Sequence, residues 1–118
     1  MHGIGVDIED GTRDPGATGL ARKYYSVAEA RVVEGEEGQV DLRSFFQFWC
    51  LKEAALKSIG QGLPFGLNAF GFELEPSLRA VLTPPGFGGP DRFSAHFLEG
   101  IEGIDGTECC AAVVIHGS

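Results

Sequence analysis

Three carboxylates and a lysine are spaced so that they meet at one point if a strand packs against a helix. Residues 3–9, Gly-Ile-Gly-Val-Asp-Ile-Glu, alternate as a strand does and place Asp7 and Glu9 on one face. Farther along the chain, Glu53 and Lys57 are four residues apart, which puts them on one stripe of a helix. Three oxygen ligands beside a cation suit a hard divalent ion such as Mg²⁺ that holds a phosphate ester.

The acidic face of the strand has two interpretations. Alternating acids at the edge of a sheet can simply point into water and have no function. However, Gly3 and Gly5 lie on the same face as Asp7 and Glu9, opposite the apolar Ile4, Val6 and Ile8. Glycine weakens a strand interior and often marks close approach by a ligand or another backbone. This pattern favours a face that is kept clear for something.

The helical pair also has two interpretations. A Glu four residues before a Lys is the favoured orientation of a surface ion pair, worth about 0.3 kcal/mol. Here the stripe also carries Trp49 and two further apolar side chains (Phe46, Cys50), so it is not freely solvated. Charges near the edge of the core interact with an ion or phosphate through less screening. Lys52 lies among apolar helix positions, and the pattern leaves open whether it extends outward to water or reaches a phosphate.

Composition excludes several classes of protein. The chain has 118 residues, 43% of them apolar, which indicates a single globular domain over residues 1–118. A net charge of −8 argues against nucleic-acid binding, and no apolar run approaches the ~20 residues that span a membrane. The three cysteines do not form a disulfide framework, and no secretory signal is apparent, so we expect a cytoplasmic protein. The three histidines lack metal-ligand spacing.

The elements predicted along the chain give an α+β fold with an antiparallel sheet packed against a long central helix. Ser26 and Glu29 form a capping-box pattern that starts a helix ending by Gly35. Asp41 caps the main helix, which runs to about Ser58. The pattern then changes to a period of two, and further strands are expected at residues 70–74, 78–82, 93–97 and 110–115.

The two motifs together resemble those of the 4′-phosphopantetheinyl transferases. The resemblance rests on G-I-G-V-D-I-E at residues 3–9 and W-C-L-K-E-A-A-L-K at residues 49–57, in this order and at this distance. Residues 59–63, residues 68–70 and the late apolar strand at 109–115 are also similar to the family, so the resemblance covers most of the chain.

The resemblance implies a reaction and a role for each site residue. The phosphopantetheine arm of coenzyme A is transferred to a serine of an apo acyl or peptidyl carrier protein, and 3′,5′-ADP is released. Asp7, Glu9 and Glu53 would bind Mg²⁺ at the pyrophosphate, with Glu53 also acting as the base for the serine hydroxyl. Lys57 would offset charge on the pyrophosphate, and Lys52 is a second candidate for contact with coenzyme A.

The chain also departs from the family's two common forms. Its length resembles the holo-acyl-carrier-protein synthase branch, whose chains form trimers with sites at subunit interfaces. Its motifs resemble the second lobe of the longer surfactin-synthetase-type branch, whose first lobe supplies much of the basic nucleotide pocket. We therefore expect a homo-oligomer, dimer or trimer, with a separate partner lobe or excision from a larger synthase as alternatives. A non-catalytic module that binds coenzyme A or a carrier, and a Mg²⁺-dependent phosphohydrolase, are the competing functions.

Overall fold

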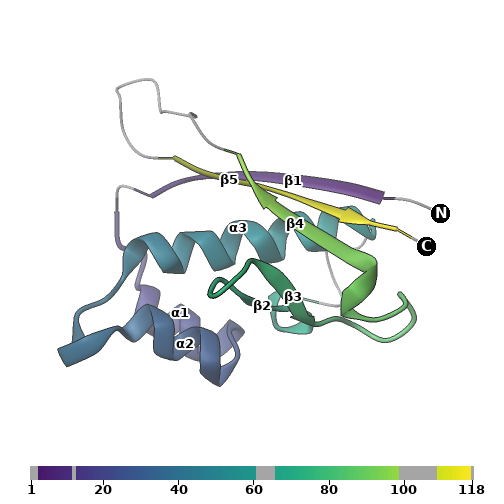
Figure 1. Ribbon diagram of the computed structural model, residues 1–118. Helices are drawn as coiled ribbons and strands as arrows, with labels where there is room; N and C mark the ends of the chain where they lie inside the picture. The colour runs from purple at the N-terminus through teal and green to yellow at the C-terminus, as the bar shows by residue number, and fades with distance from the viewer. Residues whose placement is uncertain (1–2, 12, 61–65, 99–108, 118) are drawn as a thin grey trace.

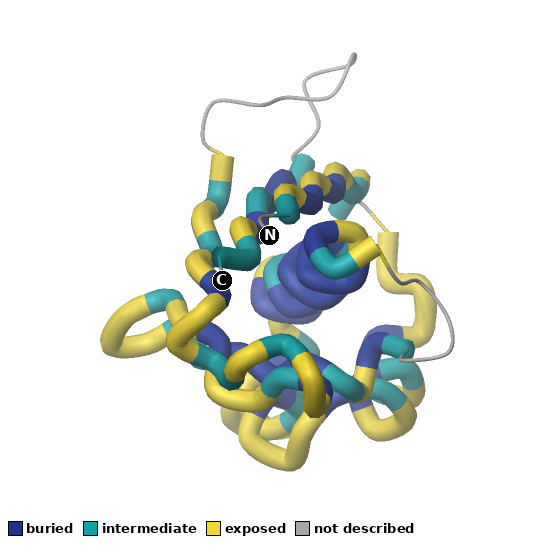
Figure 2. The backbone as a smooth tube through the Cα atoms, turned by 90° about the vertical axis from the view of Figure 1, so that its right-hand side faces the viewer, coloured by how far each residue is buried: buried dark blue, intermediate teal, exposed yellow. Residues whose placement is uncertain are grey.

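A long central helix, α3 (Leu42–Ser58), lies between a sheet on one side and short helices and strands on the other (Figures 1 and 2). The computed structural model describes residues 3–11, 13–60, 66–98 and 109–117. The other helices and strands are β1 (Gly3–Asp10), α1 (Ala17–Tyr24), α2 (Val27–Glu34), β2 (Gly71–Glu73), β3 (Arg79–Leu82), β4 (Phe93–Phe97) and β5 (Cys109–His116). Three 3₁₀ turns join them at Glu36–Gly38, Leu67–Ala69 and Pro90–Arg92.

The predicted helix boundaries are confirmed by the hydrogen bonds that cap them. Ser26 accepts from the backbone N–H of Glu29 while the Glu29 carboxylate accepts from that of Ser26, so the capping box at the start of α2 is complete. The Asp41 carboxylate accepts from the backbone N–H of Ser44 at 3.0 Å and begins α3. Helix α3 ends at Ser58, close to Gly60, whose φ of 70° favours glycine.

The described strands form two antiparallel sheets. Strands β1, β5 and β4 pair in that spatial order, with β1 at an edge, and β2 pairs with β3 separately. The first sheet covers one side of α3, and β2 packs with α2 on the other side. The predicted α+β fold, an antiparallel sheet packed against a long central helix, is therefore confirmed; among the described residues, β2 and β3 pair with each other rather than joining this sheet.

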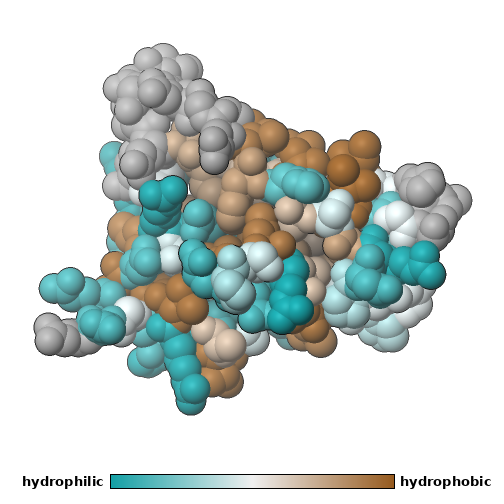
Figure 3. Space-filling view, viewed as in Figure 1, coloured by the Kyte–Doolittle hydropathy of each residue, from teal (hydrophilic) through white to brown (hydrophobic). Residues whose placement is uncertain are grey.

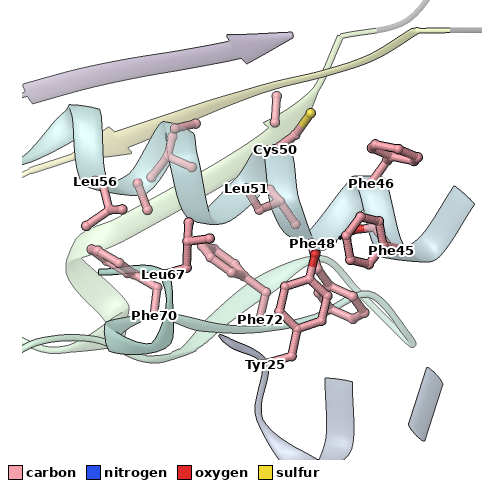
Figure 4. Packing of buried hydrophobic residues seen from close by; sticks show 14 of the residues in the cluster. Tyr25, Phe45, Phe46, Phe48, Cys50, Leu51, Leu56, Leu67, Phe70 and Phe72 are labelled. Carbon is pink, nitrogen blue, oxygen red and sulfur yellow. Dashed lines mark hydrogen bonds between the residues drawn. The ribbon is translucent and has the colours of Figure 1, made fainter. Parts of the chain in front are cut away.

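The aromatic core lies on the side of α3 that faces away from β1. Phe45, Phe48, Phe70 and Phe72 are buried there, and the predicted apolar stripe of α3 points toward them (Figure 4). The Trp49 ring of α3 meets Tyr24 of α1 edge-on at 6.3 Å. Burial of these rings supplies the main hydrophobic stabilisation of the fold.

Strand β1 turns its polar face inward and its apolar face outward. Gly5 and Asp7 are buried against α3, whereas Ile4 and Ile8 are 66% and 55% exposed. The interpretation in which Asp7 lies on a solvated sheet edge is therefore wrong. The arrangement leaves an uncovered apolar surface on the other face of the sheet, and it aims the acids of β1 at the helix that carries Glu53 and Lys57.

No helix within the described ranges combines the length and apolar character that a membrane span requires.

Candidate active site

The contact between β1 and α3 is unusually close because two glycines face the helix. A Cβ placed on Gly5 would lie 1.8 Å from the carbonyl oxygen of Ala54, and one placed on Gly3 would lie 1.8 Å from that of Ser58. Real Cβ atoms do not approach oxygens so closely, so these two positions accept only glycine without movement of the helix. The sequence prediction that this face is kept clear is correct, and what occupies it is the backbone of α3.

Lys57 closes the site by binding the strand directly. Its ammonium donates to the Asp7 carboxylate at 3.0 Å and to the carbonyl oxygen of Val6 at 3.1 Å. Asp7 is buried, whereas the Lys57 side chain is 52% exposed, so the pair lies at the boundary between core and solvent. The bond to Asp7 is the main reason why the pKa of Lys57 is raised, which keeps this cation charged.

Burial and mutual repulsion raise the pKa values of the two glutamates that surround Asp7. For Glu53 the largest cause is burial, followed by the charge of Asp7, and Lys57 opposes both. For Glu9 the causes are burial, then the charge of Asp7 and a hydrogen bond with it, then Glu53. These interactions show that the three carboxylates share one region of low screening, as the sequence predicts.

One oxygen of Asp7 has no partner within the described structure. Asp7 Oδ2 is buried and accepts no hydrogen bond, whereas Oδ1 is held by Lys57. Two ionised carboxylates have no proton to share, so the neighbouring Glu9 can bond to Asp7 only when one of them is protonated. An unpartnered buried carboxylate oxygen costs free energy unless a cation or proton reaches it.

The donor set fits a hard divalent cation. Asp7, Glu9 and Glu53 offer only oxygen ligands, and Asp7 Oδ2 has no hydrogen-bond partner among the described residues. Among the described residues, no three acidic, histidine or cysteine side chains already converge closely enough to hold an ion. Binding an ion there therefore requires a glutamate side chain to rotate toward Asp7.

Lys52, in contrast, is not part of this cluster. Its side chain is fully buried on the other side of α3, where its ammonium pairs with the Glu29 carboxylate at 2.8 Å and donates to the carbonyl oxygens of Leu67 and Phe70. Burial lowers the pKa of Lys52, and Glu29 opposes this effect. Neither prediction for Lys52, outward extension or contact with a phosphate, matches this placement. Its partner Glu29 was expected only as a helix cap, because sequence spacing cannot reveal an ion pair across 23 residues.

Two cysteines border the cluster, although no sequence pattern predicts a role for them there. Cys110 lies opposite Glu9 in the pairing of β1 with β5, so both side chains are on the face that meets α3. Cys50 lies on α3, and its thiol donates to the carbonyl oxygen of Cys110 at 3.1 Å. The spacing of Glu9 and Cys110 along the chain contains no signal of this contact, because it arises only from strand pairing.

Comparisons with known proteins agree with this geometry. Residues 3–113 match the family model of the 4′-phosphopantetheinyl transferase superfamily. The chain is 36% identical over 125 aligned positions to a phosphopantetheinyl transferase from Thraustochytrium, covering 96% of this chain and 42% of that protein. It is 29% identical over 72 residues to a 4′-phosphopantetheinyl transferase from Bacillus subtilis, covering 61% of this chain and 31% of that protein. The chain therefore spans less than half the length of these relatives.

Solved structures of similar length share the fold. The holo-[acyl-carrier-protein] synthase of Helicobacter pylori, in complex with coenzyme A, superposes with a TM-score of 0.64 at 19% identity, covering 94% of this chain and 96% of that one. The acyl carrier protein synthase of Mycobacterium tuberculosis gives a TM-score of 0.55 at 19% identity, covering 96% and 94%. Relatives in sequence are thus longer than this chain, and relatives in structure are about its size.

Proposed function

The chain belongs to the 4′-phosphopantetheinyl transferase superfamily, and we propose that it transfers the 4′-phosphopantetheine group of coenzyme A to a serine of an apo acyl or peptidyl carrier protein. The second product is 3′,5′-ADP. The observation that supports this proposal most strongly is the inward acidic face of β1, which meets Glu53 and Lys57 across two helix-facing glycines. A cytoplasmic location, which the free thiols favour, is part of the same proposal.

Asp7, Glu9 and Glu53 are the proposed ligands of Mg²⁺. When bound, the ion offsets negative charge on the pyrophosphate of coenzyme A. Asp7 supplies an oxygen that is already buried and unpartnered, and the two glutamates supply charge that is costly to leave uncompensated beside it. Burial is the largest cause of the raised pKa values of Glu9 and Glu53, and the charge of Asp7 is the second; a cation would offset this second cause.

Glu53 is the proposed base for the carrier serine. Its carboxylate lies at the edge of the site beside Asp7 and Lys57, where it can accept the proton of an incoming hydroxyl. Lys57 stays charged and half-exposed beside it, where its ammonium can offset the charge that develops on the leaving phosphate. Catalysis on this account consists of positioning and charge neutralisation, since the nucleophile belongs to the second substrate. Lys52 is left out of the proposed site because its charge is already used within the core.

An intact-mass assay tests the proposed reaction. The folded chain is incubated with Mg²⁺, coenzyme A and a panel of apo acyl and peptidyl carrier proteins. We expect one carrier to gain a single phosphopantetheine group with the wild type, and with Glu34→Gln as a control at an exposed acid, but not with Glu53→Gln. Loss of coenzyme A without a carrier would instead indicate a phosphohydrolase. Binding of coenzyme A or a carrier without any transfer would indicate a non-catalytic module.

The outer face of the first sheet is the proposed surface for self-association. Ile4, Val6 and Ile8 of β1 and Ile115 of β5 are exposed on it, and Figure 3 shows hydrophobic surface in the upper part of the molecule, where this sheet lies in Figure 1. Contiguous exposed apolar surface of this kind marks an interface more often than a free surface. A second copy is the occupant that we propose, because the structures with this fold are of this chain's length whereas the sequence relatives contain more than twice as much chain.

Self-association would also supply positive charge, which is scarce in the single chain, for binding coenzyme A. The chain carries −8 and coenzyme A is polyanionic. Lys52 and Lys57 are held by acids at the core and its boundary, and the exposed Arg22 and Arg79 are also paired with acids. A neighbouring copy can bring further cations to the site. Native mass spectrometry tests this: we expect a dimer or trimer that Val6→Asp reduces to monomer, whereas Val27→Asp, at a 70% exposed valine on α2, leaves it intact. A fully active wild-type monomer would refute the proposal.

A further inference from the structure

Two thiols meet between α3 and β5 beside the carboxylate cluster. Cys50 is completely buried, and its sulfur points to the strand side of α3, opposite to Leu51 and Phe48 (Figure 4). Its thiol donates to the carbonyl oxygen of Cys110 at 3.1 Å, and the Cys110 side chain lies on the face of β5 that meets α3. Both cysteines are in the reduced form in this structure.

The close approach of α3 to the sheet brings these thiols together. The glycines of β1 let the helix lie against the strands, and Ala112, which is fully buried on β5, is the next small residue on the same face. A disulfide needs the two Cβ atoms about 3.8 Å apart. The contact of the Cys50 sulfur with the Cys110 carbonyl oxygen, together with the Cys110 side chain on the face that meets α3, places the two cysteines next to each other.

Cys109 provides an internal contrast. It precedes Cys110 in β5, so its side chain points to the opposite face of the strand, away from Cys50. The two adjacent cysteines share sequence context and partial exposure but differ in which face they occupy. A chemistry that requires a facing thiol is therefore available to Cys110 and not to Cys109.

We propose that Cys50 and Cys110 form a reversible intrachain disulfide when a hydroperoxide oxidises the protein. The sulfur of Cys110, the more exposed of the two, attacks one peroxide oxygen as the O–O bond breaks, which gives a sulfenic acid and an alcohol or water. The sulfur of Cys50 then attacks that of Cys110: the S–S bond forms, the S–O bond breaks, and the hydroxyl leaves as water with the thiol proton. The two thiols lose two electrons to the peroxide, and a dithiol reductant reverses the reaction.

The disulfide would fix α3 to β5 one helical turn from Glu53 and across the strand pair from Glu9. Small displacements of catalytic groups are costly, so we expect oxidation to slow phosphopantetheine transfer about tenfold or more. This consequence rests on the proposed function, whereas formation of the disulfide does not. The mass measurement below therefore separates the two: it succeeds or fails whether or not the chain is a transferase.

Thiol counting by mass spectrometry tests the proposal. The folded protein is treated with hydrogen peroxide, denatured without reductant and alkylated. The chain has three cysteines, so we expect three alkyl groups before oxidation and one after it, and peptide mapping should show a Cys50–Cys110 link that dithiothreitol removes. Cys109→Ser should keep the link and end with no alkyl group, whereas Cys110→Ser should keep both remaining thiols free.

Three results would overturn the proposal: three alkylated thiols after oxidation, a link through Cys109, or oxygen addition at Cys110 without a link. The Cys110 position is only partly buried, so Cys110→Ser is expected to fold, and circular dichroism of each variant checks this. Cys50→Ala is a second variant that must also lose the link. In the transfer assay, an oxidised wild type as fast as the reduced form would refute the regulatory consequence.

Discussion

Adding one methyl group at Gly5 should move β1, which carries Asp7, away from α3, which carries Glu53 and Lys57. In Gly5→Ala, the new Cβ would lie 1.8 Å from the carbonyl oxygen of Ala54 and 2.6 Å from the backbone nitrogen of Ser58. Both obstacles are backbone atoms of α3, so no side-chain rotation relieves the overlap. The helix must move by more than an ångström at this point. Overpacking of this kind typically costs about 3 kcal/mol, which for a chain of this size corresponds to a fall in Tm of roughly 10 °C.

The displacement should reduce transfer activity under conditions in which the rest of the fold is still intact. Glu53 adjoins Ala54, so movement of α3 away from β1 carries the Glu53 carboxylate away from Asp7 and stretches the 3.0 Å bond between Lys57 and Asp7. We expect transfer to fall at least a hundredfold in Gly5→Ala at a temperature where circular dichroism shows the variant to be folded.

Gly19→Ala is the matched control. Gly19 lies in α1, and a Cβ there meets nothing within 4 Å. Alanine replaces glycine in a helix with a gain of about 1 kcal/mol, so this variant should be slightly more stable and fully active. If Gly5→Ala is as stable and as active as the wild type, the close contact between β1 and α3 does not exist in solution, and the account of how the carboxylates are positioned fails.

Two further predictions concern buried charge. Lys52→Met leaves the Glu29 carboxylate buried without its partner and should lower the free energy of unfolding in urea by about 3–5 kcal/mol. Arg22→Met breaks the exposed pair with Glu34 and should lower it by about 1 kcal/mol or less. Equal losses would contradict the buried placement of Lys52. The second concerns pH: because Glu53 has a raised pKa, the folded state binds its proton more tightly than the unfolded chain, so its contribution to stability is present below the ordinary pKa of 4.5 and is lost as pH rises through the raised value. Without divalent ions, the Tm of the wild type should therefore fall relative to that of Glu53→Gln as pH rises from about 4 to 7, and a constant difference would contradict the raised pKa.

Local chemistry made the helices predictable from the sequence. The capping box of Ser26 and Glu29 and the cap at Asp41 act within three residues, so the boundaries of α2 and α3 follow from the sequence alone. The alternation in residues 3–9 likewise gave β1 and the common face of Asp7 and Glu9. The alternation did not show which face of β1 points inward. An edge strand with one apolar and one polar face is ordinarily buried on its apolar side, whereas β1 is buried on its polar side.

Long-range contacts account for what the sequence did not reveal. Lys52 occupies an apolar position of α3 because Glu29 and two carbonyl oxygens satisfy its charge there, and none of these partners is near it in the chain. The contact of Cys50 with Cys110 depends on the register of β5 beside β1, which no local pattern fixes. The pairing of β2 with β3 in a separate sheet is likewise a long-range property that no local pattern reveals.

A titration of transfer against Mg²⁺ tests the central claim most directly, namely that Asp7, Glu9 and Glu53 together hold the ion that the reaction needs. The transfer rate is measured at increasing Mg²⁺ concentration with coenzyme A and the carrier saturating. We expect the wild type to require Mg²⁺ and Asp7→Asn to need at least tenfold more of the ion for half its maximal rate, since one charged ligand is lost. An unchanged Mg²⁺ requirement in folded Asp7→Asn would show that the ion binds elsewhere and would contradict the account.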